Sequence, residues 1–192
     1  MNTIDYYNNN ANKFVADTVY IDFKETQDKF LSKLSGNRVL DFGCGSGRDT
    51  KYFLNKGYTV EAIDGSEELC RMASQYTGIQ VKQMLFNELS EKNKYNGIWA
   101  CASILHLPKN ELKAVLLKMT DALCSNGVIY TSFKYGKFEG ERQGRFFTDF
   151  TPETFTAFIS DISNIKLLEY WFTDDVSPNR NEKWLNLLLQ KH

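Results

Sequence analysis

Residues 38–47 read RVLDFGCGSG, an apolar run with one acid that is followed by three alternating glycines. Val39 and Leu40 are bounded by turn-forming residues, as expected for the end of a buried strand. Glycine has no β-carbon, so three glycines at alternate positions allow the backbone to turn sharply. A helical pattern with Tyr52 and Phe53 on one face follows this turn. The stretch therefore predicts a strand, a glycine turn and a helix, on which a flat nucleoside-like ligand can contact bare backbone.

The spacing of the glycines separates two classes of nucleotide-binding turn. A dinucleotide-binding turn has the pattern G-x-G-x-x-G, whose third glycine allows close packing of the helix on the strand. Arg48 stands at that third position, so this pattern fails. The actual pattern of residues 41–47, D-x-G-x-G-x-G, resembles motif I of the class I S-adenosylmethionine-dependent methyltransferases. A nicotinamide-dependent enzyme is the minor alternative.

A second segment extends this resemblance. Residues 57–66 read GYTVEAIDGS, which predicts a strand that ends in an acid and leads into a helix. The resemblance covers residues 36–133, and residues 45–49 are similar to a small-molecule branch that includes the tellurite-resistance-type enzymes. It implies an α/β, Rossmann-like fold: a seven-stranded, mostly parallel sheet with helices on both faces and an antiparallel C-terminal strand.

Strands and helices alternate through most of the chain, which predicts a parallel sheet covered on both faces. The clearest helical pattern precedes Asn126 and Gly127, which are expected to end that helix. Thr151 and Pro152 predict the start of another helix, and a later linker around Pro178 is rich in turn formers. We expect strands near 38–42, 58–63, 79–84, 97–102, 127–133, 165–172 and 183–190, and helices near 48–56, 66–75 and 109–123.

A chain of 192 residues is consistent with one domain. The resemblance implies a single methyltransferase domain, 1–192, in three parts. These are an N-terminal helical lid (1–35), a cofactor-binding core (36–133), and a part with the substrate loop and the C-terminal strands (134–192).

The composition disfavours several classes of function. There are 23 Lys and Arg against 24 Asp and Glu residues, so the net charge is −1, without the basic excess of a general nucleic-acid or membrane-surface binder. The longest apolar stretch, near 98–105, is far shorter than a membrane span of about 20 residues. The four cysteines have no metal-site spacing, and the N-terminus does not resemble a signal peptide. We expect a cytoplasmic protein without a metal or a membrane partner, for which nucleic acid is disfavoured and the oligomeric state is open.

Asp64 ends the second predicted strand and is the candidate for binding a ribose. Its carboxylate can accept hydrogen bonds from both adjacent ribose hydroxyls. The alternative is that Asp64 only balances the dipole of the following helix, for which Ser66 is the better cap. By resemblance, Asp41 and the backbone from Gly43 to Gly45 serve the ammonium end of the cofactor's methionine part. Asp41 alternatively ties down the glycine turn through backbone amides.

Two positions depart from the expected pattern. Arg48 places a cation in the first turn of a helix, against the helix dipole. It is expected to bind the cofactor's carboxylate or a nearby acid, and an ordinary pair with Asp49 is an equal alternative. The family usually has an acid after the third strand that binds adenine, and Leu85 stands there in this chain. Adenine is then expected to depend on backbone groups at Leu85 and Phe86, or on a side chain at 87–88.

The N-terminal segment and the fourth strand complete the predicted cofactor site. Residues 5–14 resemble the N-terminal helix that covers the cofactor in many small methyltransferases, with Tyr7 and Phe14 as lid contacts; packing on a helix face is the alternative. Ala100, in the fourth strand, is small enough to let the backbone approach the cofactor. The predicted cofactor-binding residues are Tyr7, Phe14, Asp41, Gly43, Cys44, Gly45, Arg48, Asp64, Gly65, Ser66, Leu85, Phe86 and Ala100.

Transfer of a sulfonium methyl group needs mainly a well-placed acceptor, because that methyl is already electrophilic. His106 is the candidate general base, since histidine titrates near neutrality; a structural histidine at a strand end is the favoured alternative. Residues 133–147 are rich in glycine, cations and aromatics, and we expect a mobile loop in which Arg142 or Arg145 binds an acidic substrate group. A plain solvated loop is an equal alternative. The predicted substrate-binding residues are Tyr7, His106, Arg142 and Arg145.

These features predict an S-adenosylmethionine-dependent methyltransferase that acts on a small-molecule acceptor by in-line displacement. The compact size, the short insertions and the near-neutral charge favour such an acceptor. One alternative is an RNA or protein methyltransferase that docks through residues 133–148. Another is a non-catalytic cofactor-binding or interaction module, which Leu85 and the lack of a firm base leave open.

Overall fold

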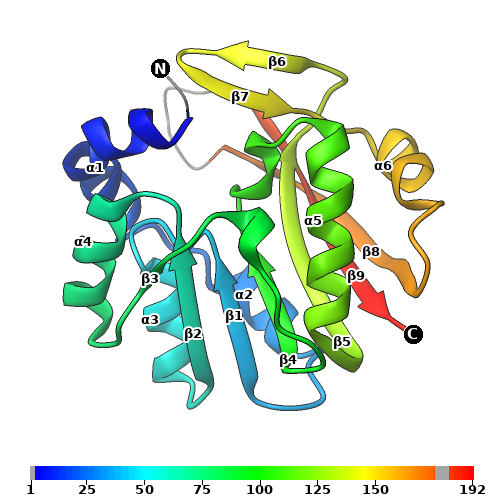
Figure 1. Ribbon diagram of the computed structural model, residues 1–192, viewed down its shortest axis with the longest axis horizontal. Helices are drawn as coiled ribbons and strands as arrows, with labels where there is room; N and C mark the ends of the chain where they lie inside the picture. Colours follow the sequence, from blue (N-terminus) through cyan, green and yellow to red (C-terminus); the bar gives the residue numbers. More distant parts are fainter. Residues whose placement is uncertain (1–2, 176–181) are drawn as a thin grey trace.

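The computed structural model describes residues 3–175 and 182–192, which are built around one sheet of seven strands (Figure 1). The first five strands in spatial order run parallel, and the sixth runs antiparallel to both of its neighbours. The predicted fold class is confirmed. In spatial order the strands are β3 (Lys82–Gln83), β2 (Thr59–Asp64), β1 (Arg38–Phe42), β4 (Tyr95–Ala100), β5 (Leu123–Lys134), β9 (Lys183–Lys191) and β8 (Ile165–Asp174).

Helices cover both faces of this sheet. On one face the rings of Phe30 and Phe53 pack against the buried Trp99. On the other face Leu112 and Phe155 belong to the larger apolar core. The helices are α1 (Thr3–Thr18), α2 (Lys24–Leu31), α3 (Arg48–Asn55), α4 (Glu67–Thr77), α5 (Lys109–Ala122) and α6 (Pro152–Ile159), with the short 3₁₀ helices η1 (Phe86–Glu88) and η2 (Ile104–His106).

The order of the strands reverses at β1, and this reversal determines where a ligand-binding crevice can form. β1 lies between β2 and β4 and is parallel to both. The chain moves from β1 to β2 and β3 on one side and then returns to β4 on the other. In open α/β sheets a crevice forms beyond the carboxyl ends of the strands at such a switch point. The glycine turn after β1 and the acid at the end of β2 meet at this edge.

Asn126 and Gly127, which were expected to end a helix, lie inside a strand. The helix α5 ends at Ala122, and β5 begins directly at Leu123. Asn126 has a φ of 61°, and the pairing of β4 with β5 is irregular near this point. A β-bulge takes residues out of the ladder, and asparagine tolerates positive φ well. The two residues do mark a bend, but their assignment to a helix end was wrong.

Much of residues 133–147, predicted as a mobile loop, forms a β-hairpin. Its strands are β6 (Glu139–Arg142) and β7 (Arg145–Thr148), which lie above one end of the large sheet (Figure 1). Gln143 and Gly144 connect them with φ values of 51° and 77°. Two positive φ values in a two-residue connection are characteristic of a type I′ turn, which matches the twist of the strands. The loop prediction was therefore wrong for this part of the segment.

The signals near the C-terminus agree with the structure. The Thr151 hydroxyl accepts a hydrogen bond from the Thr154 backbone N–H (3.3 Å), and Pro152 is the first residue of α6. Both predicted C-terminal strands are present, as β8 and β9. The predicted linker around Pro178 lies outside the described residues.

Candidate active site

A cavity of about 1540 Å³ opens beyond the carboxyl ends of the central strands. Its walls come from α1, the glycine turn, the end of β2, the segment after β4, and β7; α1 and the hairpin lie at this end of the sheet (Figure 1). Pockets for one small ligand usually have about 300–1,000 Å³, so this cavity has room for two. The predicted residues that line it are Tyr7, Phe14, Gly43, Cys44, Gly45, Arg48, Asp64, Gly65, Ser66, Leu85, Phe86, His106 and Arg145.

The glycine turn has the conformation that its sequence predicts. Gly43, Gly45 and Gly47 all have positive φ, of 86°, 55° and 79°. The N–H of Gly43 donates to the Ile63 carbonyl of β2 (3.0 Å), which joins the turn to the neighbouring strand. A β-carbon on Gly45 would lie 2.9 Å from the Phe14 ring of α1. The turn therefore offers backbone without side chains to the cavity, covered on one side by an aromatic ring.

Asp64 joins the ends of β1 and β2. One carboxylate oxygen accepts the N–H of Gly45 and the other accepts the N–H of Ser66, both at 2.9 Å. Burial raises the pKa of Asp64, and these backbone N–H groups oppose that shift. A carboxylate oxygen can accept more than one hydrogen bond, so Asp64 keeps acceptor capacity toward the cavity that it lines. Ser66 caps α4, as predicted, by accepting the N–H of Leu69 (3.2 Å).

Asp41 and Ala100 do not line the cavity. The buried Asp41 carboxyl accepts a hydrogen bond from the Thr50 hydroxyl of α3 at 2.5 Å. This bond joins α3 to β1. The sequence instead predicted that Asp41 contacts the cofactor or the backbone amides of the glycine turn. Ala100 is fully buried in the core, and the residues after it, Cys101 and Ala102, line the cavity in its place.

The Asp41 carboxyl is expected to make the protein less stable as the pH rises. Burial, with the nearby Asp49 charge, raises its pKa from 3.8 to about 8. Between these values the folded protein holds a proton that the unfolded chain has released, so the free energy of unfolding falls with increasing pH. Asp41→Asn removes this titration at nearly constant size. The urea midpoint, measured from about pH 5 to about pH 8, should fall less in the variant than in the wild type; equal falls would contradict the assignment.

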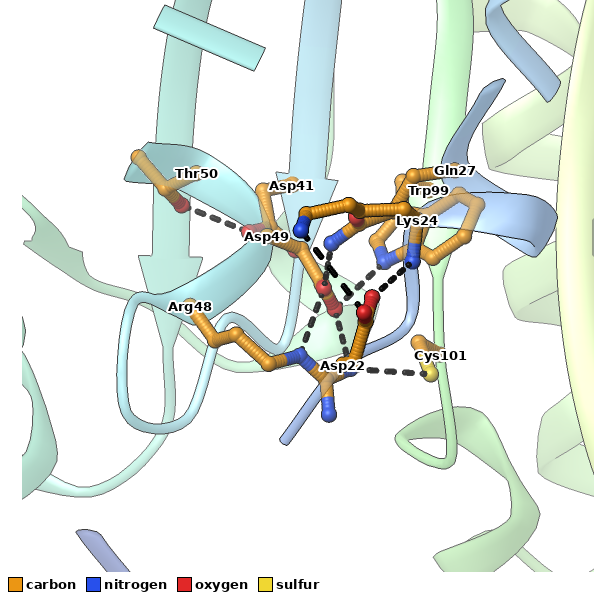
Figure 2. Close-up of polar contacts among 9 residues, drawn as sticks. All are labelled: Asp22, Lys24, Gln27, Asp41, Arg48, Asp49, Thr50, Trp99 and Cys101. Atoms are coloured by element: carbon orange, nitrogen blue, oxygen red, sulfur yellow. Dashed lines mark hydrogen bonds and ion pairs between the residues drawn. The ribbon is translucent and has the colours of Figure 1, made fainter. Parts of the chain in front are cut away.

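Arg48 forms an ion pair with Asp49 (Figure 2), and both residues line the cavity. Its Nε and Nη2 each donate to the Asp49 carboxylate at 2.8 Å. Gln27 and Trp99 also donate to this carboxylate, at 2.6 and 2.8 Å. Of the two alternatives for Arg48, the structure has the pair with Asp49. Arg48 still lines the cavity, and its guanidinium carbon lies 4.7 Å from the centroid of the Phe23 ring.

The expected adenine position has an apolar side chain and an occupied backbone group. Leu85 is 42% exposed and lines the cavity. Its backbone N–H donates to the Glu88 carboxylate (2.7 Å), which therefore caps η1. Phe86 packs against Phe42 with ring centroids 4.7 Å apart. Of the predicted alternatives at 87–88, Asn87 lines the cavity.

A chain of hydrogen bonds joins three residues of the cavity wall, Tyr7, His106 and Arg145. His106 Nδ1 lies 2.6 Å from the Phe146 carbonyl, which can only accept, so Nδ1 carries the hydrogen. Nε2 is then an acceptor and receives the Tyr7 hydroxyl (2.9 Å), while Arg145 Nη1 donates to the Tyr7 oxygen (3.3 Å). Burial lowers the pKa of His106 to about 4. The histidine is therefore neutral near pH 7, with its free lone pair on a tyrosine.

Arg142, the other predicted substrate arginine, lies elsewhere. Its guanidinium donates to the buried Asp149 carboxylate at 2.6 and 3.2 Å and stacks over Phe138 at 3.8 Å. It does not line the cavity. The prediction that Arg142 binds substrate is not supported by this placement, because the charge of Arg142 already has a buried partner.

Sequence analysis missed the contacts that dock α1 onto the core. The Ser66 hydroxyl donates to Asn8 Oδ1 (2.7 Å), and the Phe146 N–H donates to the Thr3 hydroxyl (3.2 Å). These contacts join one helix to α4 and to β7. The two residues of each contact are 58 and 143 positions apart in the chain, so no local sequence pattern predicts these contacts.

Two further properties concern the described residues alone. No helix among them is long and apolar enough to cross a membrane. No group of three or more His, Cys, Asp or Glu side chains in residues 3–175 and 182–192 is placed to hold a metal ion. The four cysteines are free thiols.

Comparison with known proteins points to one family. Residues 39–127 match the family model described as a methyltransferase domain. An uncharacterized methyltransferase of Staphylococcus carnosus (strain TM300) is 24% identical over 155 residues, which cover 77% of this chain and 74% of that protein. The tellurite-resistance-type branch stays a prediction.

Solved structures share the fold over nearly the whole chain. One is Burkholderia thailandensis 1,6-didemethyltoxoflavin-N1-methyltransferase with bound 1,6-didemethyltoxoflavin and S-adenosylhomocysteine, with a TM-score of 0.77, 19% identity, and coverage of 97% of this chain and 84% of that chain. Another is magnesium protoporphyrin IX methyltransferase from Synechocystis PCC 6803 with bound S-adenosylmethionine, with a TM-score of 0.73, 17% identity, and coverage of 98% and 95%. The domain match over residues 39–127, the glycine turn and the strand order together make this chain similar to the class I methyltransferases.

Proposed function

We propose that this protein uses S-adenosylmethionine to methylate a small-molecule acceptor. The observation that carries the proposal is the junction of Gly45 with the Asp64 carboxylate at the cavity wall, 2.9 Å apart. Bare backbone beside an acid suits a nucleoside with free ribose hydroxyls. A dinucleotide also has such hydroxyls, but its turn needs a third glycine where this chain has Arg48, and this cation is already neutralised by Asp49.

The residues around this junction fit the separate parts of such a nucleoside. Asp64 would accept the ribose hydroxyls, and the backbone from Gly43 to Gly45 would contact the methionine end. Leu85 and Phe86 would pack against the adenine, mainly through apolar contact. When bound, S-adenosylmethionine supplies an electrophilic sulfonium methyl group. The protein has no acid at the adenine position, and loss of one hydrogen bond costs only about 1 kcal/mol.

The acceptor is assigned to the part of the cavity near Tyr7. Holding an acceptor in line with a methyl group can contribute about 7–11 kcal/mol through positioning alone. The neutral His106 accepts the Tyr7 hydroxyl and so fixes the direction of that phenol. In this proposal Tyr7 contacts the acceptor. His106 stays the candidate base, reached through Tyr7.

A small acceptor is favoured by the way the cavity is covered. The hairpin and α1 both contribute to its wall, and together they leave about 1540 Å³ for two ligands. Both structural neighbours carry names that specify small-molecule methylation. A net charge of −1 gives no general attraction for RNA. Methylation of RNA or protein is the alternative, and a non-catalytic binding module is a second one.

Calorimetric titration of the pure protein tests the cofactor. We expect S-adenosylhomocysteine and S-adenosylmethionine to bind with micromolar dissociation constants, and NAD to bind far more weakly because Arg48 stands where a dinucleotide-binding turn has its third glycine. Absence of binding at millimolar S-adenosylhomocysteine would remove the proposal. For the RNA alternative, steep weakening of RNA binding with added salt is the expected sign. Binding of the cofactor without methyl transfer to any acceptor class would favour the non-catalytic module.

A further inference from the structure

We propose that the acceptor carries a carboxylate or a similarly compact oxyanion, and that Arg145 binds it. This inference rests on the proposed function, because it assigns the acceptor part of the same cavity. Arg145 is the first residue of β7, and its side chain lines the cavity beside Tyr7. Three properties of Arg145 point to an anion: its hydrogen-bond donors, its charge and its stacking.

The donors of Arg145 are incompletely used. Nη1 donates to the Tyr7 oxygen at 3.3 Å. Nε is buried and has no hydrogen-bond partner among the described residues. A guanidinium has five N–H donors in a planar fork, whose edge matches the two oxygens of a carboxylate. Buried donors are unfavourable when unpaired, so a side-chain adjustment that brings Nε to a bound oxyanion would correct this defect.

The charge of Arg145 has no acidic partner within 4 Å in the described part of the chain. Its neighbour across the hairpin, Arg142, pairs with the buried Asp149 at 2.6 Å. The other cation on this part of the cavity wall, Lys134, pairs with Glu182 at 2.5 Å. The hairpin thus neutralises one of two facing arginines and leaves the positive charge of the other at the cavity.

Three aromatic rings surround the guanidinium of Arg145. Its central carbon lies 4.6 Å from the Tyr6 ring centroid, 5.8 Å from that of Tyr7 and 5.1 Å from that of Phe147. Such cation–π contacts stabilise a cation without neutralising it. The rings therefore leave the charge of Arg145 available to an anion in the cavity.

A chain of contacts places Arg145 next to the proposed cofactor position. Tyr7, which Arg145 contacts, also packs edge-on against Phe14, with ring centroids 5.3 Å apart. Phe14 in turn covers Gly45 of the glycine turn. An acceptor held at Arg145 by an anionic group would therefore have its remaining atoms beside Tyr7, between the arginine and the turn.

Benzoate and benzamide provide the test, because they share a ring and a shape but differ in charge. Each is titrated by calorimetry into wild-type protein saturated with S-adenosylhomocysteine. We expect benzoate to bind about tenfold more tightly than benzamide, since a charge-assisted bond is roughly twice as strong as a neutral one. In Arg145→Gln this preference should disappear. Arg71→Gln, which removes the same charge from the exposed side of α4, should keep it.

The outcomes separate this inference from the proposed function. If S-adenosylhomocysteine does not bind, the proposed function fails. If it binds but benzoate and benzamide bind equally, or neither binds at ten-millimolar concentration, only the anion inference fails. A full preference for benzoate in folded Arg145→Gln also overturns it. Should Arg145→Gln not fold, Arg145→Lys replaces it: a point charge without the planar fork should retain a reduced preference, and an undiminished one counts against Arg145.

Discussion

Asp64→Asn is expected to weaken the binding of S-adenosylhomocysteine by roughly 10- to 100-fold. The substitution keeps one oxygen acceptor but removes the charge, and a hydrogen bond to a charged group contributes about 1.5–3 kcal/mol, where 1.4 kcal/mol is about tenfold in affinity. Asp64→Ala should weaken binding further, because both carboxylate oxygens are lost. Calorimetric titration of each variant gives the dissociation constants.

Asp64 has a structural role that any test of its ribose contact has to separate from binding. Asp64 also accepts the backbone N–H groups of Gly45 and Ser66, so its removal loosens the turn as well as the ribose contact. Thermal unfolding of each variant has to accompany the titrations. Asp28→Asn removes a similar group from an exposed position on α2 and should bind as the wild type does. If folded Asp64→Asn retains wild-type affinity, Asp64 does not hold the ribose.

Asp49→Ala is expected to lower the free energy of unfolding by about 3–5 kcal/mol, as found when one partner of a buried ion pair is removed. The Asp49 carboxylate accepts hydrogen bonds from Arg48, Gln27 and Trp99 (Figure 2). Alanine would leave a largely buried guanidinium and two further donors without an acceptor. Since whole domains are stable by only about 5–15 kcal/mol, much of the protein's stability depends on this one side chain. Urea unfolding of the pure proteins provides the measurement.

A matched pair of variants shows whether burial causes this effect. Asp161→Ala breaks an ion pair with Lys113 on the surface, where the Asp161 side chain is 76% exposed, and should change the urea midpoint little. The double variant Arg48→Met, Asp49→Leu removes the buried charges together and should recover part of the lost stability. Recovery stays incomplete because Gln27 and Trp99 still lack their acceptor. A midpoint for Asp49→Ala no lower than that for Asp161→Ala would refute the account.

Local patterns predicted the parts of this molecule that local chemistry determines. Alternating glycines readily adopt positive φ, and an acid at a strand end meets them across one pair of parallel strands, so residues 41–47 and Asp64 were found from sequence. Thr151 and Pro152 likewise mark a helix start by their own hydrogen-bonding groups. The glycine turn and the helix start depend on residues within a few positions of one another. Asp64 lies 19 positions after Gly45, but it ends the adjacent parallel strand, so the regular order of strand, turn, helix and strand places it beside the turn.

Features that depend on distant partners could not be predicted in this way. Asp49 gathers donors 22 and 50 positions away in the chain, and only its pairing with Arg48 could be considered from sequence. The hairpin was taken for a loop because its glycines and cations are typical of loops. The hairpin turn is formed by Gln143 and Gly144, between two short strands. A glycine by itself does not distinguish such a turn from a loop. Arg142 and Arg145 were equivalent in sequence, and only the buried Asp149 separates them.

One helix, α1, contacts both the proposed cofactor part and the proposed acceptor part of the cavity. Phe14 covers the glycine turn, Tyr7 contacts Arg145, and Thr3 is bound to the hairpin. Movement of this helix away from the core would open both parts of the cavity at once. Under the proposed function, we expect one such movement to release both the spent cofactor and the methylated product.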